Sequence, residues 1–385
     1  MFGLRREFRP PLTRLILKTV LYGSWVLGLF PFIFNSRKCQ LRRSRWLLFY
    51  GGIMNYFLLF FMVFLGFQYQ KEHKLEAFER NPVLENINIL IAVISMFSAL
   101  VIHFMNFWGS KKVEKIVNEL LTLEYRDFKG LKLTNCPTFN CFVIQKWVTM
   151  MGHSVTFLMA NYGLPGNESH LYLVLLSGLV QVSNNFNKIH YYVGILLVYR
   201  YVWIINRQLK DLVNQLILNP TTDSSRICQL LSLYNRLLQL NKKLVSTYEF
   251  HMILMLTAWL AGNIVVVYFS IVYGISMHKV SIFLIVFPQT MLVNIWDFWL
   301  TVSVCELTEK AGRKTSSLLK RFADLEYSDD QLEKSVNEFA WLCSHRKFQF
   351  QLCGLFHVNY KMGFQMIITS ILYLLYLVQF DYMNL

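Results

Sequence analysis

Blocks of apolar residues long enough to cross a lipid bilayer dominate this 385-residue sequence. A membrane-spanning helix needs about 20 consecutive, mainly apolar residues, and eight blocks approach or exceed that length. Polar stretches separate the blocks without a Pro-, Ser- or Gly-rich linker or a repeat, so we predict a single domain over residues 1–385. The eight blocks cover residues 16–34, 46–69, 84–108, 142–163, 171–205, 251–275, 281–304 and 354–380.

These blocks are predicted to be helices and not the strands of a membrane barrel. Barrel strands are about 10 residues long and alternate between apolar and polar side chains, whereas residues 58–65 are apolar at every position. A helix also satisfies its backbone hydrogen bonds within the segment, as lipid requires. The composition agrees, because 55% of residues are hydrophobic and only 16% are charged, too few for the surface of a soluble multidomain enzyme.

The basic residues indicate how the spans are oriented. If block 16–34 does not cross, the other seven alternate, and the segments on one side hold 29 Lys and Arg against 4 on the other. Cytosolic loops are enriched in Lys and Arg, so the basic side is expected to be the cytosol. The expected fold class is an all-α membrane protein with seven transmembrane helices, a cytosolic N-terminus and an extracellular C-terminus. The net charge of +15 then records orientation, and no nucleic-acid partner is predicted.

Block 16–34 is predicted to re-enter the membrane or to lie at its surface. Four Arg residues precede it and five basic residues follow it within 35–45, so both ends favour the cytosol. Gly23, Gly28 and Pro31 also interrupt the block, which makes a regular crossing helix less favourable. A crossing signal-anchor helix is the alternative.

The predicted outer loops are short. The loop 163–170 contains the sequon Asn167-Glu168-Ser169, so Asn167 is a candidate glycosylation site on the extracellular side.

The predicted inner side, by contrast, carries a cytosolic helical anchor. Segments 206–250 and 305–353 have apolar residues at steps of three and four, which indicates helices with one apolar face. Block 171–205 would be about 52 Å long as a helix, against a hydrocarbon core of roughly 30 Å, so its end should project into the cytosol. The stripe residues are Leu230, Leu233, Leu237, Leu240, Leu244 and Tyr248, followed by Leu318, Phe322, Leu325, Leu332, Val336 and Phe339.

No pattern of catalytic or metal-binding residues is found, so we predict no enzyme activity, no cofactor and no metal site. The Ser317-x-x-Lys320 pair lacks the companion motifs of serine hydrolases. His103, His153 and His357 are scattered and are interpreted as polar residues satisfied within a bundle.

Charged residues inside the blocks are costly in lipid and are functional candidates by default. Lys146 and Lys188 lie near predicted boundaries, where their side chains could reach the headgroups. Asp297 lies deeper, and we interpret it as a buried structural contact in preference to part of an ion pathway.

The last block carries one polar stripe. Gln365, Thr369, Tyr373, Tyr376 and Gln379 follow one another at steps of four, four, three and three, which places them on one face of a helix. Such a stripe is typical of a water-lined pore or of a seam between helices. Taken alone, the pattern favours the seam.

The C-terminal residues resemble the signature of insect gustatory receptors. Leu372-Tyr373, five hydrophobic residues and then Gln379-Phe380 are similar to that family's Thr-Tyr-(five hydrophobics)-Gln-Phe motif, with Leu372 in place of the Thr. The segment 353–359 also resembles the one that opens the family's last helix. Length, seven spans, an internal N-terminus and a Gly…Pro-Phe re-entrant piece extend the resemblance over the whole chain.

This resemblance implies a ligand-gated, non-selective cation channel of four subunits, formed as a homo- or hetero-tetramer with other gustatory receptors. The last helix of each subunit would line the pore. The motif match implies Gln379 at the outer constriction, Tyr376 one turn below as the gate and Phe380 packed behind, with Tyr373 and Thr369 further along the pore stripe. The implied location is the plasma membrane of sensory neuron dendrites, among membrane lipid. The ligand would be a small tastant, with bitter or other aversive compounds expected.

The tastant pocket is expected in the outer halves of the second to sixth spans, because there is no outer domain. Aromatic walls with a few amides suit a small organic ligand, although ordinary packing explains the same residues. The candidates are Tyr162, Gln181, Asn184, Tyr268, Tyr273 and Gln289.

Two other classes of membrane protein are alternatives to a receptor channel. A G-protein-coupled receptor also has seven helices, but its N-terminus faces outward and its Asp-Arg-Tyr and Asn-Pro-x-x-Tyr signatures are missing here. A membrane transporter would need a paired set of intramembrane acids and bases, which the sequence does not show.

Overall fold

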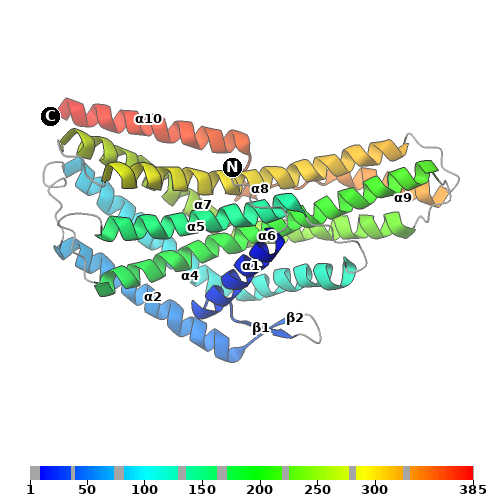
Figure 1. The fold of residues 1–385 in the computed structure, drawn as a ribbon, viewed down its shortest axis with the longest axis horizontal. Helices are drawn as coiled ribbons and strands as arrows, with labels where there is room; N and C mark the ends of the chain where they lie inside the picture. Colours follow the sequence, from blue (N-terminus) through cyan, green and yellow to red (C-terminus); the bar gives the residue numbers. More distant parts are fainter. Residues whose placement is uncertain are drawn as a thin grey trace.

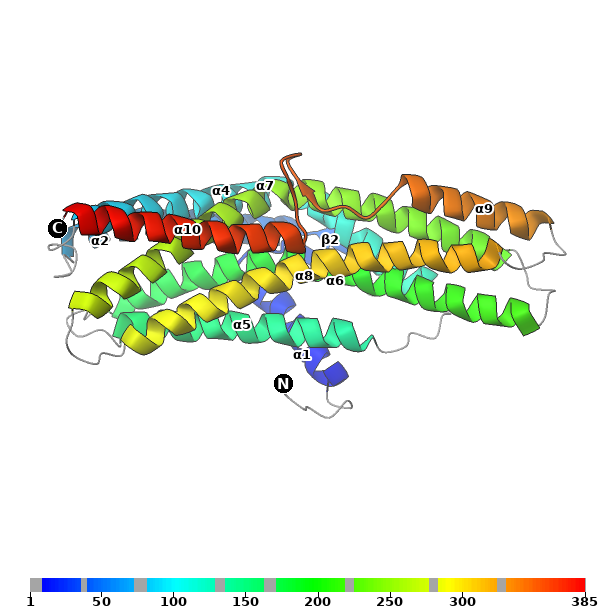
Figure 2. The same cartoon turned by 90° about the horizontal axis from the view of Figure 1, so that it is seen from above.

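The computed structural model is an elongated bundle of long helices (Figures 1 and 2). It describes residues 9–35, 40–72, 82–128, 136–162, 171–218, 225–276, 283–323 and 330–384. The helices are α1 (Arg9–Val26), α2 (Arg45–Glu72), α4 (Pro82–Thr122) with the π-helical turn η1 (Leu123–Asp127), α5 (Pro137–Tyr162), α6 (Leu171–Leu218), α7 (Ser225–Ser276), α8 (Phe283–Ala323), α9 (Asp330–His345) and α10 (Tyr360–Asn384). Two short antiparallel hairpins pair β1 (Phe32–Asn35) with β2 (Gln40–Arg43) and β3 (Gln351–Leu352) with β4 (Phe356–His357).

Each of the seven blocks predicted to span the membrane falls mainly within one long helix. These helices are α2, α4, α5, α6, α7, α8 and α10. Four of these helices continue well beyond their blocks. The most extended, α7, has 52 residues and is therefore about 78 Å long. The bundle consequently has two halves: α2, α5 and α10 occupy one half, and the ends of α6, α7 and α8 together with α9 form the other (Figure 1).

Within the described residues, two helices are long and apolar enough to cross a membrane, Ser225–Tyr268 and Tyr360–Gln379. Shorter apolar helical stretches lie in α2 (Arg45–Phe61) and α4 (Met96–Met105). Polar residues lower the hydropathy of other helices, as the run at 183–188 does near the middle of α6. The seven-span topology and its sidedness stay predictions.

Residues 16–34 do reverse the direction of the chain, as a re-entrant segment requires. α1 lies obliquely across the long helices (Figure 1) and ends at Val26. Gly28 then adopts a φ of +67°, and a Cβ there would lie 2.8 Å from the Cα of Gly51 in α2, so this close approach needs glycine. The β1–β2 hairpin follows, and the Asn118 side chain of α4 holds it by hydrogen bonds to the backbone N–H and C=O of Leu41, at 2.6 and 3.0 Å. Its position in the membrane stays a prediction.

The predicted apolar stripes of the inner segments are confirmed. They form the packed core of the half built by α6, α7, α8 and α9. Burial of an apolar face is what makes such amphipathic helices stable in water. The buried stripe residues are Leu230, Leu233, Leu237, Leu240, Leu244 and Tyr248 of α7, Leu318 and Phe322 of α8, and Leu332, Val336 and Phe339 of α9; Leu325 lies outside the described residues.

Candidate functional site: the last helix and the cavity beneath α1

The N-terminus of α10 is fixed to the rest of the subunit. The Asn359 side chain accepts a hydrogen bond from the backbone N–H of Met362 at 2.9 Å, which is an N-cap. Tyr360 stacks on Trp299 of α8 with ring centroids 5.3 Å apart. Gly363 packs closely against Trp299 and Val302. Asn359 therefore caps the helix, which begins at Tyr360, whereas the preceding residues 351–357 form the β3–β4 hairpin.

Beyond this first turn, most of α10 is exposed in the single subunit. The side chains of Tyr373 and Tyr376 are 57% and 65% exposed, and those of Gln365 and Gln379 are also exposed, with Thr369 half-buried. None of the five polar-stripe side chains forms a hydrogen bond with another described residue. The backbone of Phe380 belongs to α10, and its side chain lies outside the described part. The stripe is therefore available to water or to a partner outside this chain.

The six candidate tastant residues are brought together only in part. Gln181 of α6 donates to the backbone carbonyl of His153 in α5, and Gln289 of α8 donates to the hydroxyl of Thr156 one turn further, both at 3.5 Å. Asn184 lies almost one turn after Gln181 on α6, and its Oδ1 atom is buried without a partner among the described residues. Gln181 and Gln289 thus both contact α5, at residues about one turn apart.

The other candidates are separate from this group or undescribed. Tyr268 is fully buried in α7. The side chains of Tyr162 and Tyr273 lie outside the described part, although their backbones belong to α5 and α7. Asn167, the candidate glycosylation site, lies outside the described residues altogether.

One charged residue is buried where the sequence suggested otherwise. Lys146 of α5 is only 5% exposed, so the prediction that it reaches the headgroups is wrong. Its Nζ atom donates to Asp297 of α8 at 2.7 Å, and the hydroxyl of Thr149 donates to the same carboxylate oxygen at 2.7 Å. Lys188 of α6 also interacts electrostatically with Asp297. Asp297 thus makes the structural contact that was expected, since it ties α8 to α5, and its side chain is 15% exposed.

His103 is satisfied on both ring nitrogens, as predicted. Its Nδ1 atom lies 2.7 Å from Oδ1 of Asn55 in α2, and its Nε2 atom lies 3.3 Å from the hydroxyl of Ser183 in α6. His153 differs, because its Nε2 atom is buried with no partner among the described residues. Among the residues that the structure describes, no group of three or more His, Cys, Asp or Glu could hold a metal ion.

At the other half of the bundle, ion pairs join the end of α4 to its neighbours. Arg236 of α7 donates to Glu119 at 2.6 and 3.0 Å and also to Asp127 of η1. Burial opposes the charged form, but the hydrogen bonds to Glu119 and Asp127 raise the pKa of Arg236 above its ordinary value. Arg200 of α6 makes a bidentate pair with Glu124 of η1 at 3.2 and 3.3 Å.

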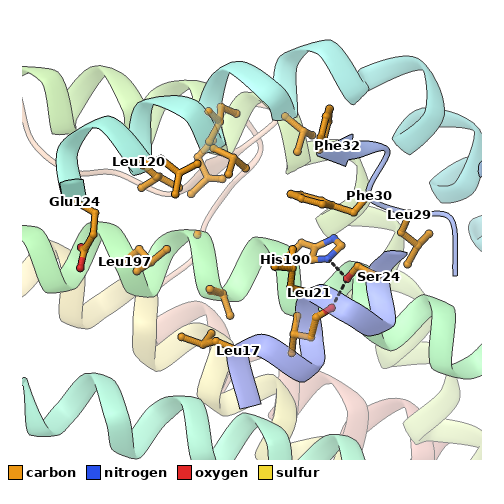
Figure 3. A pocket seen from close by; sticks show the side chains of 18 of the residues that line it. Leu17, Leu21, Ser24, Leu29, Phe30, Phe32, Leu120, Glu124, His190 and Leu197 are labelled. Atoms are coloured by element: carbon orange, nitrogen blue, oxygen red, sulfur yellow. Dashed lines mark hydrogen bonds between the residues drawn. The ribbon is translucent and has the colours of Figure 1, made fainter. Parts of the chain in front are cut away.

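A cavity of about 360 Å³ lies between α1, the turn that follows it, α4, α6 and α7 (Figure 3). Its walls are mainly apolar, and they include Leu17, Leu21, Phe30, Leu120 and Leu197. Of the tastant candidates whose side chains are described, none lines it.

Several polar residues lie in the cavity wall, including Ser110, Tyr125, Tyr201 and Tyr248. Two further places carry polar groups that are paired with each other. On one side, the Ser24 hydroxyl donates to the backbone carbonyl of Val20 at 2.6 Å and lies 2.7 Å from Nε2 of His190. On another side is the Arg200–Glu124 pair. Sequence reasoning missed Ser24 and His190, because only the fold brings residues 166 positions apart together; a His within an apolar block was the one available signal.

Comparison with known proteins gives a consistent result. The family model described as 7tm Chemosensory receptor matches residues 17–384. Gustatory receptor 22b of Drosophila melanogaster is 64% identical over the full length of both chains, and a gustatory receptor for bitter taste, 22e, from the same organism is 40% identical over 98% of both chains. The structure of the olfactory receptor OR5 from the insect Machilis hrabei, in complex with eugenol, superposes with a TM-score of 0.68 and covers 95% of this chain and 98% of its own, at 9% identity.

The match over nearly the whole chain, the full-length relatives and the shared helical fold all lead to one assignment. The chain belongs to the insect gustatory receptors of the 7tm chemosensory receptor family.

Proposed function

We propose that this chain is a subunit of a tastant-gated, non-selective cation channel in which α10 of four subunits lines the pore. The observation that carries the proposal is the exposed polar stripe of α10. Within one subunit these side chains have no partners among the described residues, although a helix in lipid should not present them to hydrocarbon. A central, water-lined pore surrounded by copies of α10 satisfies them.

The proposed constriction lies near the C-terminal end of α10. Gln379 would form the outer ring, where amide oxygens without a fixed charge suit weak cation selectivity. Tyr376 lies about one turn below, and four Tyr rings would make a narrow, partly apolar gate that closes by dewetting. Phe380 would pack behind them, with Tyr373 and Thr369 lining the pore further inward. The tetramer would be formed by identical chains or with other gustatory receptors.

The proposed tastant pocket lies in the outer half of the bundle, around the amides of Gln181, Asn184 and Gln289. The contacts of Gln181 and Gln289 with α5 support this position. Tyr162, Tyr268 and Tyr273 are the aromatic candidates for its walls. The relative named for bitter taste supports bitter or other aversive compounds as ligands.

The channel proposal includes a location and an orientation. We place the receptor in the plasma membrane of sensory neuron dendrites with its N-terminus in the cytosol. The C-terminus and a glycan on Asn167 would then face outward. Antibody access to an N-terminal tag in intact cells tests the orientation, and labelling of that tag before permeabilisation contradicts it.

Patch-clamp recording of the expressed chain with a panel of tastants tests the channel itself. Tyr376→Ala or Gln379→Ala is expected to change ion selectivity or gating, because each removes part of the constriction. Ile371→Ala is the matched control, since it is also exposed on α10 but lies about 140° around the helix from Tyr376. Currents unchanged by both stripe variants would remove the pore assignment.

A further inference from the structure

We propose that the cavity beneath α1 is a second binding site, which takes a neutral, mainly apolar molecule carrying one hydroxyl group. The cavity is separate from the proposed tastant pocket, because its walls come from α1, the turn after it, and the parts of α4, α6 and α7 near Leu120, Leu197 and Leu244.

The size of the cavity indicates a ligand. The cavity is partly open to the surface of the chain, so a small molecule can enter it. An engineered cavity of about 150 Å³ with aliphatic and aromatic walls is large enough to bind benzene, and this cavity has a volume of about 360 Å³. It also lies within the range of about 300–1,000 Å³ that is typical of small-molecule sites.

The charges in the wall favour a neutral ligand. Arg200 and Glu124 are the charged side chains among the residues that line the cavity. They neutralise each other through two hydrogen bonds of 3.2 and 3.3 Å, so neither needs a counter-ion from a ligand. The remaining wall is dominated by Leu, Val, Ile and Phe side chains, against which a charged ligand would lose its hydration without compensation.

His190 supplies the acceptor for a hydroxyl group. The Ser24 hydroxyl donates its proton to the carbonyl of Val20, so its oxygen accepts the hydrogen bond from Nε2–H of His190. In the neutral ring the other nitrogen, Nδ1, is then an acceptor. Nδ1 makes no hydrogen bond with any described residue, and His190 lines the cavity beside Phe30 (Figure 3). A ligand hydroxyl that donates to Nδ1 would complete this chain of hydrogen bonds.

The position of the site connects it to the pore helix. A molecule in the cavity would contact α1 and the turn after it on one side and α7, through Leu244 and Tyr248, on another. α7 also packs along α10. An effect of the ligand on currents therefore rests on the proposed channel function, whereas binding itself does not.

Photolabelling of the full-length receptor in detergent with the diazirine alcohol 3-azioctanol tests the site. Mass spectrometry is expected to find adducts in residues 17–32, 110–125 and 190–201. 1-Octanol should compete for labelling about fivefold to tenfold better than 1-methoxyoctane, because the ether lacks the hydroxyl donor. Adducts confined to α5 and the outer part of α8, or equal competition by alcohol and ether, would overturn the proposal.

Two variants test separately the hydrogen-bond acceptor on His190 and the volume of the cavity. His190→Phe keeps a ring but removes the acceptor, so the preference for the alcohol over the ether should disappear. Leu197→Trp fills the cavity and should abolish labelling. Gln289→Ala is the control in the proposed tastant pocket, and it should leave labelling of the cavity intact. The mapping on the unmodified receptor decides the question even if a variant does not fold, and it needs no ion current.

A hydroxyl-bearing ligand could come from the membrane or from solution. In phosphatidylcholine vesicles, displacement of 3-azioctanol by added diacylglycerol identifies a membrane lipid, and displacement by 1-octanol alone identifies a soluble alcohol. Both results support the site. Displacement by neither would contradict it.

Discussion

The two helices that follow α8 differ in a way that hydrophobicity alone does not explain. α9 is the more polar helix, yet most of its apolar residues, including Phe339, are buried within the chain, with Trp341 as an exposed exception. α10 is the more apolar helix, yet Leu372 and Tyr376 are 61% and 65% exposed. The polar helix is therefore the better packed of the two within one copy of the chain.

The difference follows from the solvent proposed for each helix. In water, an amphipathic helix is stable only if its apolar face is buried against the same chain or a partner. In a membrane, lipid and neighbouring subunits satisfy apolar side chains, so hydrophobicity carries no information on burial within the subunit. Contacts inside one copy should thus determine the stability of the α9 region, whereas contacts between copies should determine the behaviour of α10.

The largest effect is expected at the centre of the α9 interface. Phe339→Ala removes a fully buried ring that packs on Tyr234 with centroids 5.3 Å apart. The loss should be about 3–5 kcal/mol, seen as a lower midpoint of thermal unfolding in detergent. Trp341→Ala on the same helix is the control, because its ring is 63% exposed. Equal losses of stability for both variants would contradict the claim that the Phe339 face of α9 is the buried one.

A smaller effect is expected from Glu309 of α8, which contacts the segment between α9 and α10 by accepting a hydrogen bond from the backbone N–H of Phe350. Burial and the nearby Glu306 raise the pKa of Glu309 from 4.5 to about 6, against the opposing effects of Arg313 and Phe350. The folded state thus holds the proton more tightly than the unfolded chain, so this contribution to stability is complete below pH 4.5 and is lost as the pH rises through about 6.

Glu309→Gln is therefore expected to raise the unfolding midpoint at pH 7 and to remove this residue's share of the pH dependence between pH 4.5 and 6. The change should be at most about 2 kcal/mol. Unfolding curves of both forms across this pH range provide the measurement. A destabilised Gln variant at pH 7 would show that the carboxylate is favoured by its surroundings instead.

The N-cap of α10 should contribute less. Asn359→Ala removes the hydrogen bond to the N–H of Met362 and should cost about 1 kcal/mol. Faster hydrogen exchange is expected in the first turn of α10, with exchange in α9 unchanged. Asn359→Asp keeps a capping oxygen and should restore protection. If the Ala variant exchanges like the parent, the Tyr360–Trp299 stack alone holds the first turn.

The same contrast explains what could be predicted from the sequence. Apolar blocks and stripes depend on local periodicity, so the helices and the buried face of α9 could be predicted from the sequence. The hairpin at 351–357 was not, because Leu355 and Phe356 look like the start of the last span. The backbone turns there instead, with positive φ values at Cys353 and Gly354.

Contacts between residues far apart in the sequence could not be predicted, for a different reason. Lys146 and Asp297 are 151 positions apart, and no periodicity links them, so the boundary position of Lys146 suggested headgroup contact. The cavity beside His190 is likewise a property of the assembled helices. On α10, by contrast, the stripe itself is visible in the sequence, whereas its proposed partners belong to other subunits.

The smallest effect is expected at the position where the sequence departs from the family motif. Leu372→Thr restores the motif, and the Leu side chain is already 61% exposed in the subunit. Substitutions at such positions usually change stability by no more than about 0.5 kcal/mol, so the unfolding midpoint of the detergent-solubilised subunit should stay almost constant. A large drop would show that α10 is packed within its own subunit, and the contrast with α9 would then fail.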